Sequence, residues 1–196
     1  MRSRSLALAA SLLLSLVLTG CFADGKPPAL GTEVSIPNGY ELVAVSSYGV
    51  LDNNLTFYCR DLASNRNYTC NNGKISTEVS IPSGYRLVSA SAYGPLDNNV
   101  TLYCQNTQTD RVYACDSNKI KGEIAVPTGY TFAGASAYGR LDNNFTLYCR
   151  NRTTQEIFAC TNGRIGEKIN LPARDTFIDA AAYGKLDNRA IALKSQ

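Results

Sequence analysis

A unit of 45 residues recurs along this chain, and that internal repetition limits the possible folds more than any other feature. Each copy carries the block Tyr-Gly-x-Leu-Asp-Asn, where x is any residue, and a proline precedes each block at a fixed distance. The blocks begin at Tyr48, Tyr93, Tyr138 and Tyr183, and the prolines are Pro37, Pro82, Pro127 and Pro172. A chain of this kind folds as similar units packed against one another.

The second unit shows the strand pattern of the repeat. Residues 78–81 alternate in polarity and are stopped by Pro82, and Ser83-Gly84 is typical of a turn. Further candidate strands are 85–93, 100–104 and 111–115, in which Val, Ile, Thr and Tyr concentrate. Since no segment of the mature chain shows a sustained helical period with caps, the chain is predicted to be all-β.

About four strands in each unit of this length are typical of a propeller blade, so we predict tandem repeats in a propeller-like or prism-like arrangement. A β-trefoil, which needs three units, and a linear stack of hairpins, which needs no closure, are the alternatives. The last unit ends after its third strand, so an N-terminal strand could complete a closed ring, although Lys26-Pro27-Pro28 and Gly31 make 22–32 resemble a tether. The units, three complete and one truncated, are assigned as 33–77, 78–122, 123–167 and 168–196.

Six of the seven cysteines follow the repeat. They form three pairs eleven residues apart, Cys59/Cys70, Cys104/Cys115 and Cys149/Cys160. An even number of cysteines in an exported chain predicts disulfides, and the absence of histidine disfavours zinc. If the third and fourth strands form a hairpin centred on Thr109 and Asp110, Cys104 and Cys115 lie opposite each other on one face. We therefore expect each pair to close within its own unit.

The seventh cysteine, Cys21, follows a short secretion signal. Arg2 and Arg4 precede an apolar stretch of roughly 13 residues, which is too short to span a bilayer. The junction Leu18-Thr19-Gly20-Cys21 resembles the lipobox of bacterial lipoproteins. That resemblance implies removal of residues 1–20, lipidation of Cys21, and sorting to the outer membrane because residue 22 is Phe rather than Asp. The alternative is an ordinary signal peptide that leaves Cys21 as an unpaired thiol.

The charge of the mature chain is nearly balanced. Removing Arg2 and Arg4 from the 19 basic residues leaves 17, against 16 acidic residues. A nucleic-acid surface normally carries a marked basic excess, so no nucleic-acid partner is expected. The expected attachments are the membrane, through the lipid, and a glycan or protein partner.

The polar residues of the repeated block are the candidate ligand-binding residues. Tyr, Asp and Asn bind sugar hydroxyls well, yet the same residues also hold tight turns through bonds to nearby amides. A calcium loop is a weaker alternative, because each unit supplies only one carboxylate. The candidates are Tyr48, Asp52, Asn53, Tyr93, Asp97, Asn98, Tyr138, Asp142, Asn143, Tyr183, Asp187 and Asn188.

Tyrosines also recur on the strand face opposite the cysteines. Tyr58, Tyr103 and Tyr148 are spaced by the repeat and could form a stripe for a ligand. In a β protein, however, such tyrosines are more often part of the core.

Catalysis finds little support, because the chain has no histidine to act as a base and the repeated acidic motifs offer no single asymmetric centre. We expect no enzyme activity, cofactor or metal. One hypothesis is a carbohydrate-binding or adhesive module with several equivalent sites. The other is an inhibitor or immunity protein that would bind through the segments in which the units differ, 60–66, 105–110 and 150–156. A purely structural role in the envelope is a third.

Overall fold

The computed structural model describes residues 13–19, 33–47, 55–71, 73–92, 100–116, 118–138, 144–171, 176–183 and 188–194. These residues confirm the all-β class, since all their regular elements are strands arranged in sheets of four. Within these ranges no helix is long and apolar enough to cross a membrane.

Each sheet is one blade built from antiparallel neighbours. Blade 1 comprises β3 (Tyr40–Ser47), β4 (Leu55–Asp61), β5 (Asn67–Asn71) and β6 (Lys74–Val79). Blade 2 comprises β7 (Tyr85–Ala92), β8 (Val100–Asn106), β9 (Val112–Asp116) and β10 (Lys119–Glu123). Blade 3 comprises β11 (Tyr130–Tyr138), β12 (Asn144–Asn151), β13 (Ile157–Thr161) and β14 (Arg164–Lys168).

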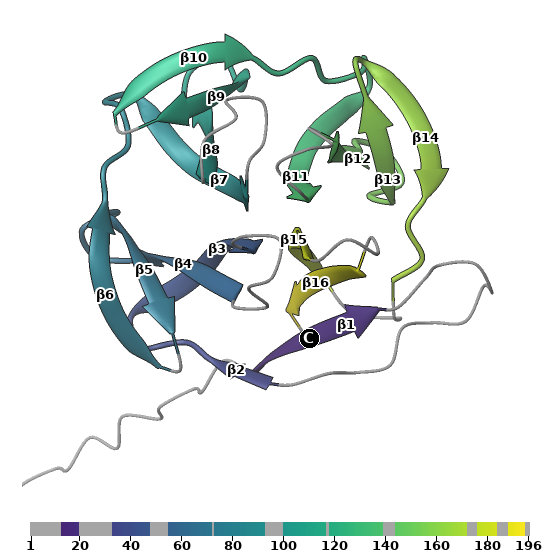
Figure 1. Cartoon of the computed structure of the whole chain (residues 1–196). Helices are drawn as coiled ribbons and strands as arrows, with labels where there is room; N and C mark the ends of the chain where they lie inside the picture. Colours follow the sequence, from purple (N-terminus) through teal and green to yellow (C-terminus); the bar gives the residue numbers. More distant parts are fainter. Residues whose placement is uncertain are drawn as a thin grey trace, which may run out of the picture.

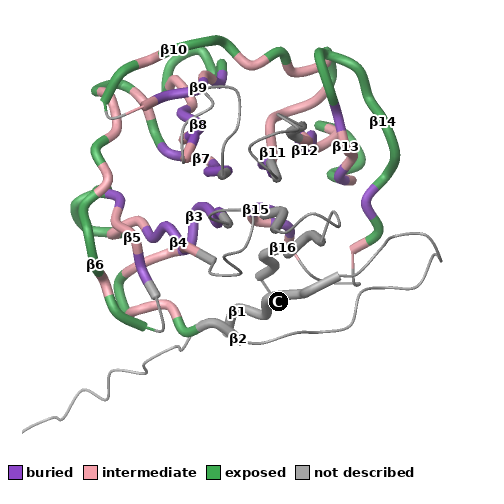
Figure 2. The backbone as a smooth tube through the Cα atoms, in the orientation of Figure 1, coloured by how far each residue is buried: buried purple, intermediate pink, exposed green. Residues whose placement is uncertain are grey.

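The blades stand around a common axis, as in a propeller (Figure 1). The first strands β3, β7 and β11, together with β15 (Thr176–Tyr183) of blade 4, contact one another around the centre. The last strands β6, β10 and β14 form the rim, where most residues are exposed, and the buried residues lie further inward (Figure 2). The core is therefore a ring around the axis, with the repeat as its unit.

The boundary between blades falls later than the sequence indicated. Residues 78–81 were expected to begin the second unit, but β6 pairs with β5, placing Tyr68 opposite Glu78, and therefore belongs to blade 1. The chain turns at the next segment, where Tyr85 N donates to Pro82 O and Gly84 has a φ of 81°. Blade 2 thus begins at Tyr85, and the expected strands that follow are present as β7, β8 and β9.

Blade 4 draws its strands from both ends of the chain. Its order is β15, β16 (Asn188–Lys194), β1 (Leu13–Thr19) and β2 (Glu33–Ser35). An N-terminal strand therefore closes the ring, as one of the sequence hypotheses allowed, but this strand lies within the expected signal. The closure is that of the unprocessed chain, and the expected tether 22–32 lies outside the described residues.

The three predicted disulfides are present, and each closes within one blade, between Cys59 and Cys70, Cys104 and Cys115, and Cys149 and Cys160. The expected register of the hairpin was wrong, because Cys104 and Cys115 do not lie directly opposite each other. Cys104 lies opposite Tyr113, and Cys115 opposite Leu102, so the two cysteines are diagonal neighbours. The reason is that the turn is centred between Gln108 and Thr109, one residue earlier than expected, since Gln105 lies opposite Val112. Asp110, which precedes β9, adopts a φ of 58° in this turn. The cysteines still share one face, with their Cα atoms 6.1 Å apart.

The repeated tyrosines of the second strands belong to the core. Tyr58, Tyr103 and Tyr148 are at most 4% exposed. Each hydroxyl forms a hydrogen bond with a serine on the neighbouring inner strand; the serines are Ser46, Ser91 and Ser136. Burial raises the pKa of the Tyr58 and Tyr103 hydroxyls, so both stay neutral at ordinary pH. These rings therefore cannot form an exposed stripe for a ligand.

Candidate functional site

A single carboxylate lies where the inner strands converge. Asp179 on β15 is fully buried, and its Oδ2 accepts hydrogen bonds from Val45 N at 3.0 Å and Ala90 N at 3.4 Å. Its Oδ1 accepts from Ser89 Oγ at 2.8 Å and Ala135 N at 3.3 Å. Val45, Ala90 and Ala135 are spaced by the repeat, so the three neighbouring blades present equivalent amides to one side chain. The centre of the ring is thus closed by an aspartate that only blade 4 supplies.

The ionisation of this aspartate is unusual. Burial raises the pKa of Asp179 well above its ordinary value, although the hydrogen bonds from Val45, Ser89, Ala180 and Ala135 act in the opposite direction. Perturbed carboxylates are common at active sites, but a catalytic group must reach a substrate. Asp179 has no exposed surface, and its partners belong to the protein. Its role in this structure is to join the blades.

The equivalent amides also locate the repeated Tyr-Gly-x-Leu-Asp-Asn blocks. Each block follows the inner strand of its blade in the sequence and precedes the second strand, and the ends of the four inner strands that lead into the blocks lie at the same end of the ring. We call this end the block face. Tyr138 ends β11 opposite Asn144, and Tyr183 ends β15 opposite Asn188.

Most candidate residues of the blocks cannot be placed individually. Only the backbones of Tyr138, Tyr183 and Asn188 are described. Tyr48, Asp52, Asn53, Tyr93, Asp97, Asn98, Asp142, Asn143 and Asp187 lie outside the described residues, as does Cys21.

The opposite end of the ring, which we call the hairpin face, carries the turns between second and third strands. The three segments expected to contact a protein partner, 60–66, 105–110 and 150–156, all include these turns and therefore lie on one face. Each turn also docks on the entry to its own blade, through the bonds Leu62 N to Gly39 O, Thr107 N to Gly84 O and Arg152 N to Gly129 O. The three turns therefore share their position in the blade and their backbone hydrogen bond, and they differ in their side chains.

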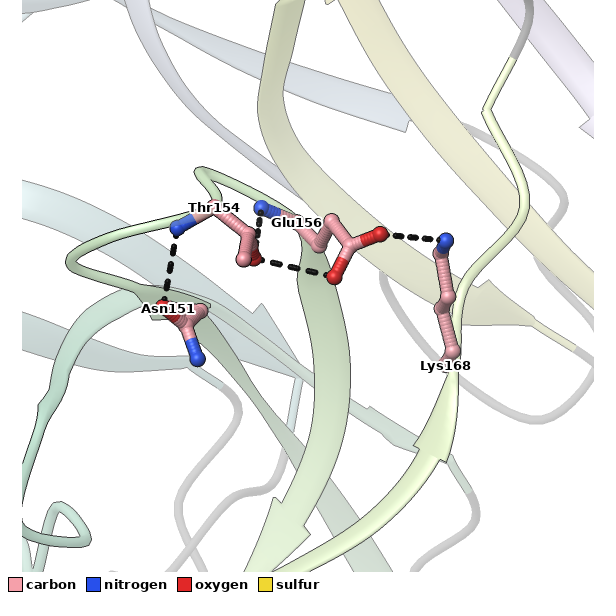
Figure 3. Close-up of polar contacts among 4 residues, drawn as sticks. All are labelled: Asn151, Thr154, Glu156 and Lys168. Carbon is pink, nitrogen blue, oxygen red and sulfur yellow. Dashed lines mark hydrogen bonds and ion pairs between the residues drawn. The ribbon is translucent and has the colours of Figure 1, made fainter.

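An aspartate or asparagine at one position of the repeat holds each of these turns, and this position was not singled out from the sequence. Asn151 Oδ1 accepts hydrogen bonds from Thr153 N at 2.8 Å and Thr154 N at 3.0 Å, and Figure 3 shows the second of these. Asp61 and Asn106 do the same in blades 1 and 2. These amide bonds lower the pKa of Asp61. The signal was available, because the three residues are spaced by 45 positions.

A groove of about 420 Å³ opens between blades 2 and 3 next to the hairpin turns. Arg111 and Arg152 line it together with Tyr130 and Glu123, and Arg111 Nη1 lies 3.5 Å from Glu123 Oε2. An adjoining hollow adds two further arginines, Arg86 and Arg150. The groove itself is balanced in charge, because Asp110 and Glu123 oppose Arg111 and Arg152, and the two arginines of the hollow give the combined surface a basic excess. The rings of Tyr130 and Phe132 both lie in the groove wall.

Metal ligands do not gather in the part of the chain that the structure describes: no three His, Cys, Asp or Glu side chains there are placed to hold a metal ion. The six paired cysteines are disulfide-bonded.

No protein-family model matches the chain, and a search of curated proteins finds no match either. The geometry of the two faces is therefore the basis for a functional assignment.

Proposed function

We propose that this protein is a lipid-anchored, non-catalytic binding module of the bacterial envelope, which binds a carbohydrate or surface ligand through its block face. The observation that carries the proposal is the arrangement of the inner strands, each of which is followed in the sequence by one Tyr-Gly-x-Leu-Asp-Asn block. The inner strands of the four blades contact one another around one axis, where equivalent amides of three blades meet at Asp179. Four similar weak sites on one body give avidity without a strong single site.

A non-catalytic role agrees with the chemistry of the described residues. The carboxylate with the largest perturbation, Asp179, is sealed in the core. The sequence contains no histidine, and the paired cysteines are oxidised. Nucleophilic or acid–base catalysis would need an accessible activated group, which the described surface does not supply. Anchoring rests on the lipobox resemblance at Cys21.

The test is a glycan and matrix-protein panel probed with the Cys21→Ser chain and with variants of the block aspartates. Asp97→Ala should weaken capture, and combined changes at Asp52, Asp97, Asp142 and Asp187 should abolish it with little change in the melting temperature. Glu167→Ala is the matched control, because it removes an exposed carboxylate from the rim strand β14. Unchanged binding by the combined variant would refute the proposal.

The alternative is an inhibitor or immunity protein that binds a toxin or hydrolase through the hairpin face. It is favoured by the groove between blades 2 and 3 together with the adjoining hollow, which jointly hold four arginines against two carboxylates and lie beside segments in which the unit sequences differ. Such a partner would present acidic groups to Arg111 and Arg152. Affinity capture from envelope extracts separates the two functions. A protein partner lost with Arg152→Ala and kept with Asp97→Ala supports the alternative, and capture of polysaccharide with no protein argues against it.

A further inference from the structure

The strand β1 occupies the third-strand position of blade 4 in the register of the other blades. In blade 1, Phe57 lies opposite Cys70, and Cys59 opposite Tyr68. The repeat makes Ala192 the equivalent of Phe57 and Lys194 the equivalent of Cys59. These two residues lie opposite Leu16 and Leu14, so β16 receives β1 as β4 receives β5. The position between β16 and β2, which we call the strand slot, is thus a regular part of the ring.

Covalent attachment distinguishes this blade from the others. In blades 1 to 3 a disulfide joins the third strand to the second. In blade 4 Lys194 and Leu16 stand at the two cysteine positions, so no disulfide can join the third strand to the second there. Its pairing with β2 is also shifted by one residue, since Leu14 lies opposite Val34 whereas Tyr68 lies opposite Glu78. The third strand of blade 4 is therefore exchangeable in a way that the other three are not.

We propose that the strand slot is a binding site for an extended apolar strand of a partner protein, opened when residues 1–20 are removed. The inference rests on the proposed export of the chain. Removal of β1 leaves the backbone groups of β16 that face it unpaired, and such an edge accepts another strand. The neighbouring segment 21–32 is a poor replacement, because Pro27 and Pro28 cannot donate to a strand ladder.

The present occupant indicates the chemistry of the partner strand. β1 runs antiparallel to both β16 and β2, and residues 14–19 pair continuously with β16. Residues 14–19 are Leu-Ser-Leu-Val-Leu-Thr, which contain no charge and no proline. A suitable partner strand therefore has at least six apolar or small uncharged residues without proline. A second copy of this chain cannot donate β1, because processing removes it from every copy.

The test uses the full Cys21→Ser chain, oxidised to form its three disulfides, and a fluorescent peptide with the sequence of residues 12–20. The unaltered full chain should not bind the peptide, because its own β1 fills the slot. A full chain with Leu16→Pro should bind one peptide per chain and melt at a higher temperature with it. The same peptide carrying Leu16→Pro is the matched control and should bind roughly tenfold more weakly, the effect of one lost ladder hydrogen bond.

A variant that fails to fold does not end the test, because the chain isolated from the envelope is the second arm. It should begin at Cys21 and bind the peptide as the Leu16→Pro chain does. An isolated chain that still contains residues 13–19 would overturn the proposal, and so would equal binding of the proline peptide or no binding by the processed chain. Glycan capture by the same preparations distinguishes this failure from failure of the block-face function.

Discussion

Gly134 lies so close to Asp179 that a Cβ atom at position 134 would overlap the carboxylate oxygen Oδ1. The two residues occupy the same position of the repeat, in which blades 1 and 2 carry Ala44 and Ser89. Blade 3 thus leaves the space that the carboxylate of blade 4 fills. The four blades are equivalent in backbone but complementary at the axis, where a symmetric set of residues would leave either a void or a collision.

Gly134→Ala should lower the free energy of unfolding by about 1–3 kcal/mol, because the added methyl group displaces a buried carboxylate from its hydrogen bonds. Urea denaturation followed by tyrosine fluorescence measures the loss. Gly122→Ala is the control and should change little, since nothing lies within 4 Å of its Cβ position. The cost of Gly134→Ala should shrink in an Asp179→Ala background. An equal cost in both backgrounds would show that the two residues are not coupled.

The raised pKa of Asp179 predicts the pH dependence of stability. The folded state holds the proton at pH values where the unfolded chain has lost it, so the contribution is fully present below about pH 4 and is lost as pH rises through the folded pKa. The unfolding free energy of the unaltered chain, minus that of Asp179→Asn, should therefore fall with increasing pH. Urea titrations across a pH series measure this difference. A rise with pH would show that the surrounding amides hold the carboxylate ionised.

Much of the architecture follows from the periodicity. The spacing of Cys104 and Cys115 predicts the disulfide, and the turn at Ser83-Gly84 separates two strands that the structure confirms as β6 and β7. These features depend on local geometry, which the sequence displays directly. The blade boundary was less accessible, because residues 78–81 have the composition of a strand whichever neighbour they pair with. Pairing with β5 is a tertiary preference, and strand propensity does not determine it.

The pairing of β1 that closes the ring, and the buried Asp179 at the axis, were not predictable from the periodicity. Comparison of the units identifies positions that carry the same residue in every unit. Asp179 is at a position where each of the other units carries a different residue, so this comparison does not select it. A lone aspartate between Ile178 and Ala180 on an apolar strand is nevertheless a usable signal, since a buried carboxylate needs several donors around it. β1 was assigned to export on its length and composition, properties that an apolar third strand shares.

Asn67→Val should stabilise the protein by about 1 kcal/mol, because Asn67 Oδ1 is buried with no hydrogen-bond partner among the described residues. The equivalent positions in blades 2 and 3 hold Val112 and Ile157, each 2% exposed, so a branched apolar side chain fits the site. Chemical denaturation measures the gain. The reverse exchange, Val112→Asn, should destabilise blade 2. A stability loss for Asn67→Val would indicate that Asn67 has a partner outside the described residues.

One cross-strand ion pair recurs in three blades with its polarity reversed in the last. Arg66 faces Glu78 and Arg111 faces Glu123, whereas blade 3 places Glu156 opposite Lys168, with Lys168 Nζ 2.6 Å from Glu156 Oε1 (Figure 3). All three blades place opposite charges at the same two positions, but in blade 3 the acidic residue occupies the position that is basic in blades 1 and 2. The pairing therefore depends on mutual attraction between neighbouring strands rather than on a surface charge of fixed sign.

The reversal predicts that exchanging both charges in blade 3 is tolerated. Glu156→Lys alone sets two cations against each other and should lower the melting temperature slightly, by less than Gly134→Ala does, because the site is exposed. Adding Lys168→Glu should recover most of the loss. Lys168 lowers the pKa of Glu156, so the pair's contribution is present above the unfolded pKa of Glu156 and is lost as pH falls through its folded pKa. Melting curves of the four variants at low salt, high salt and acid pH measure this coupling. Recovery that persists in high salt would mean that side-chain packing, and not charge, makes the pair.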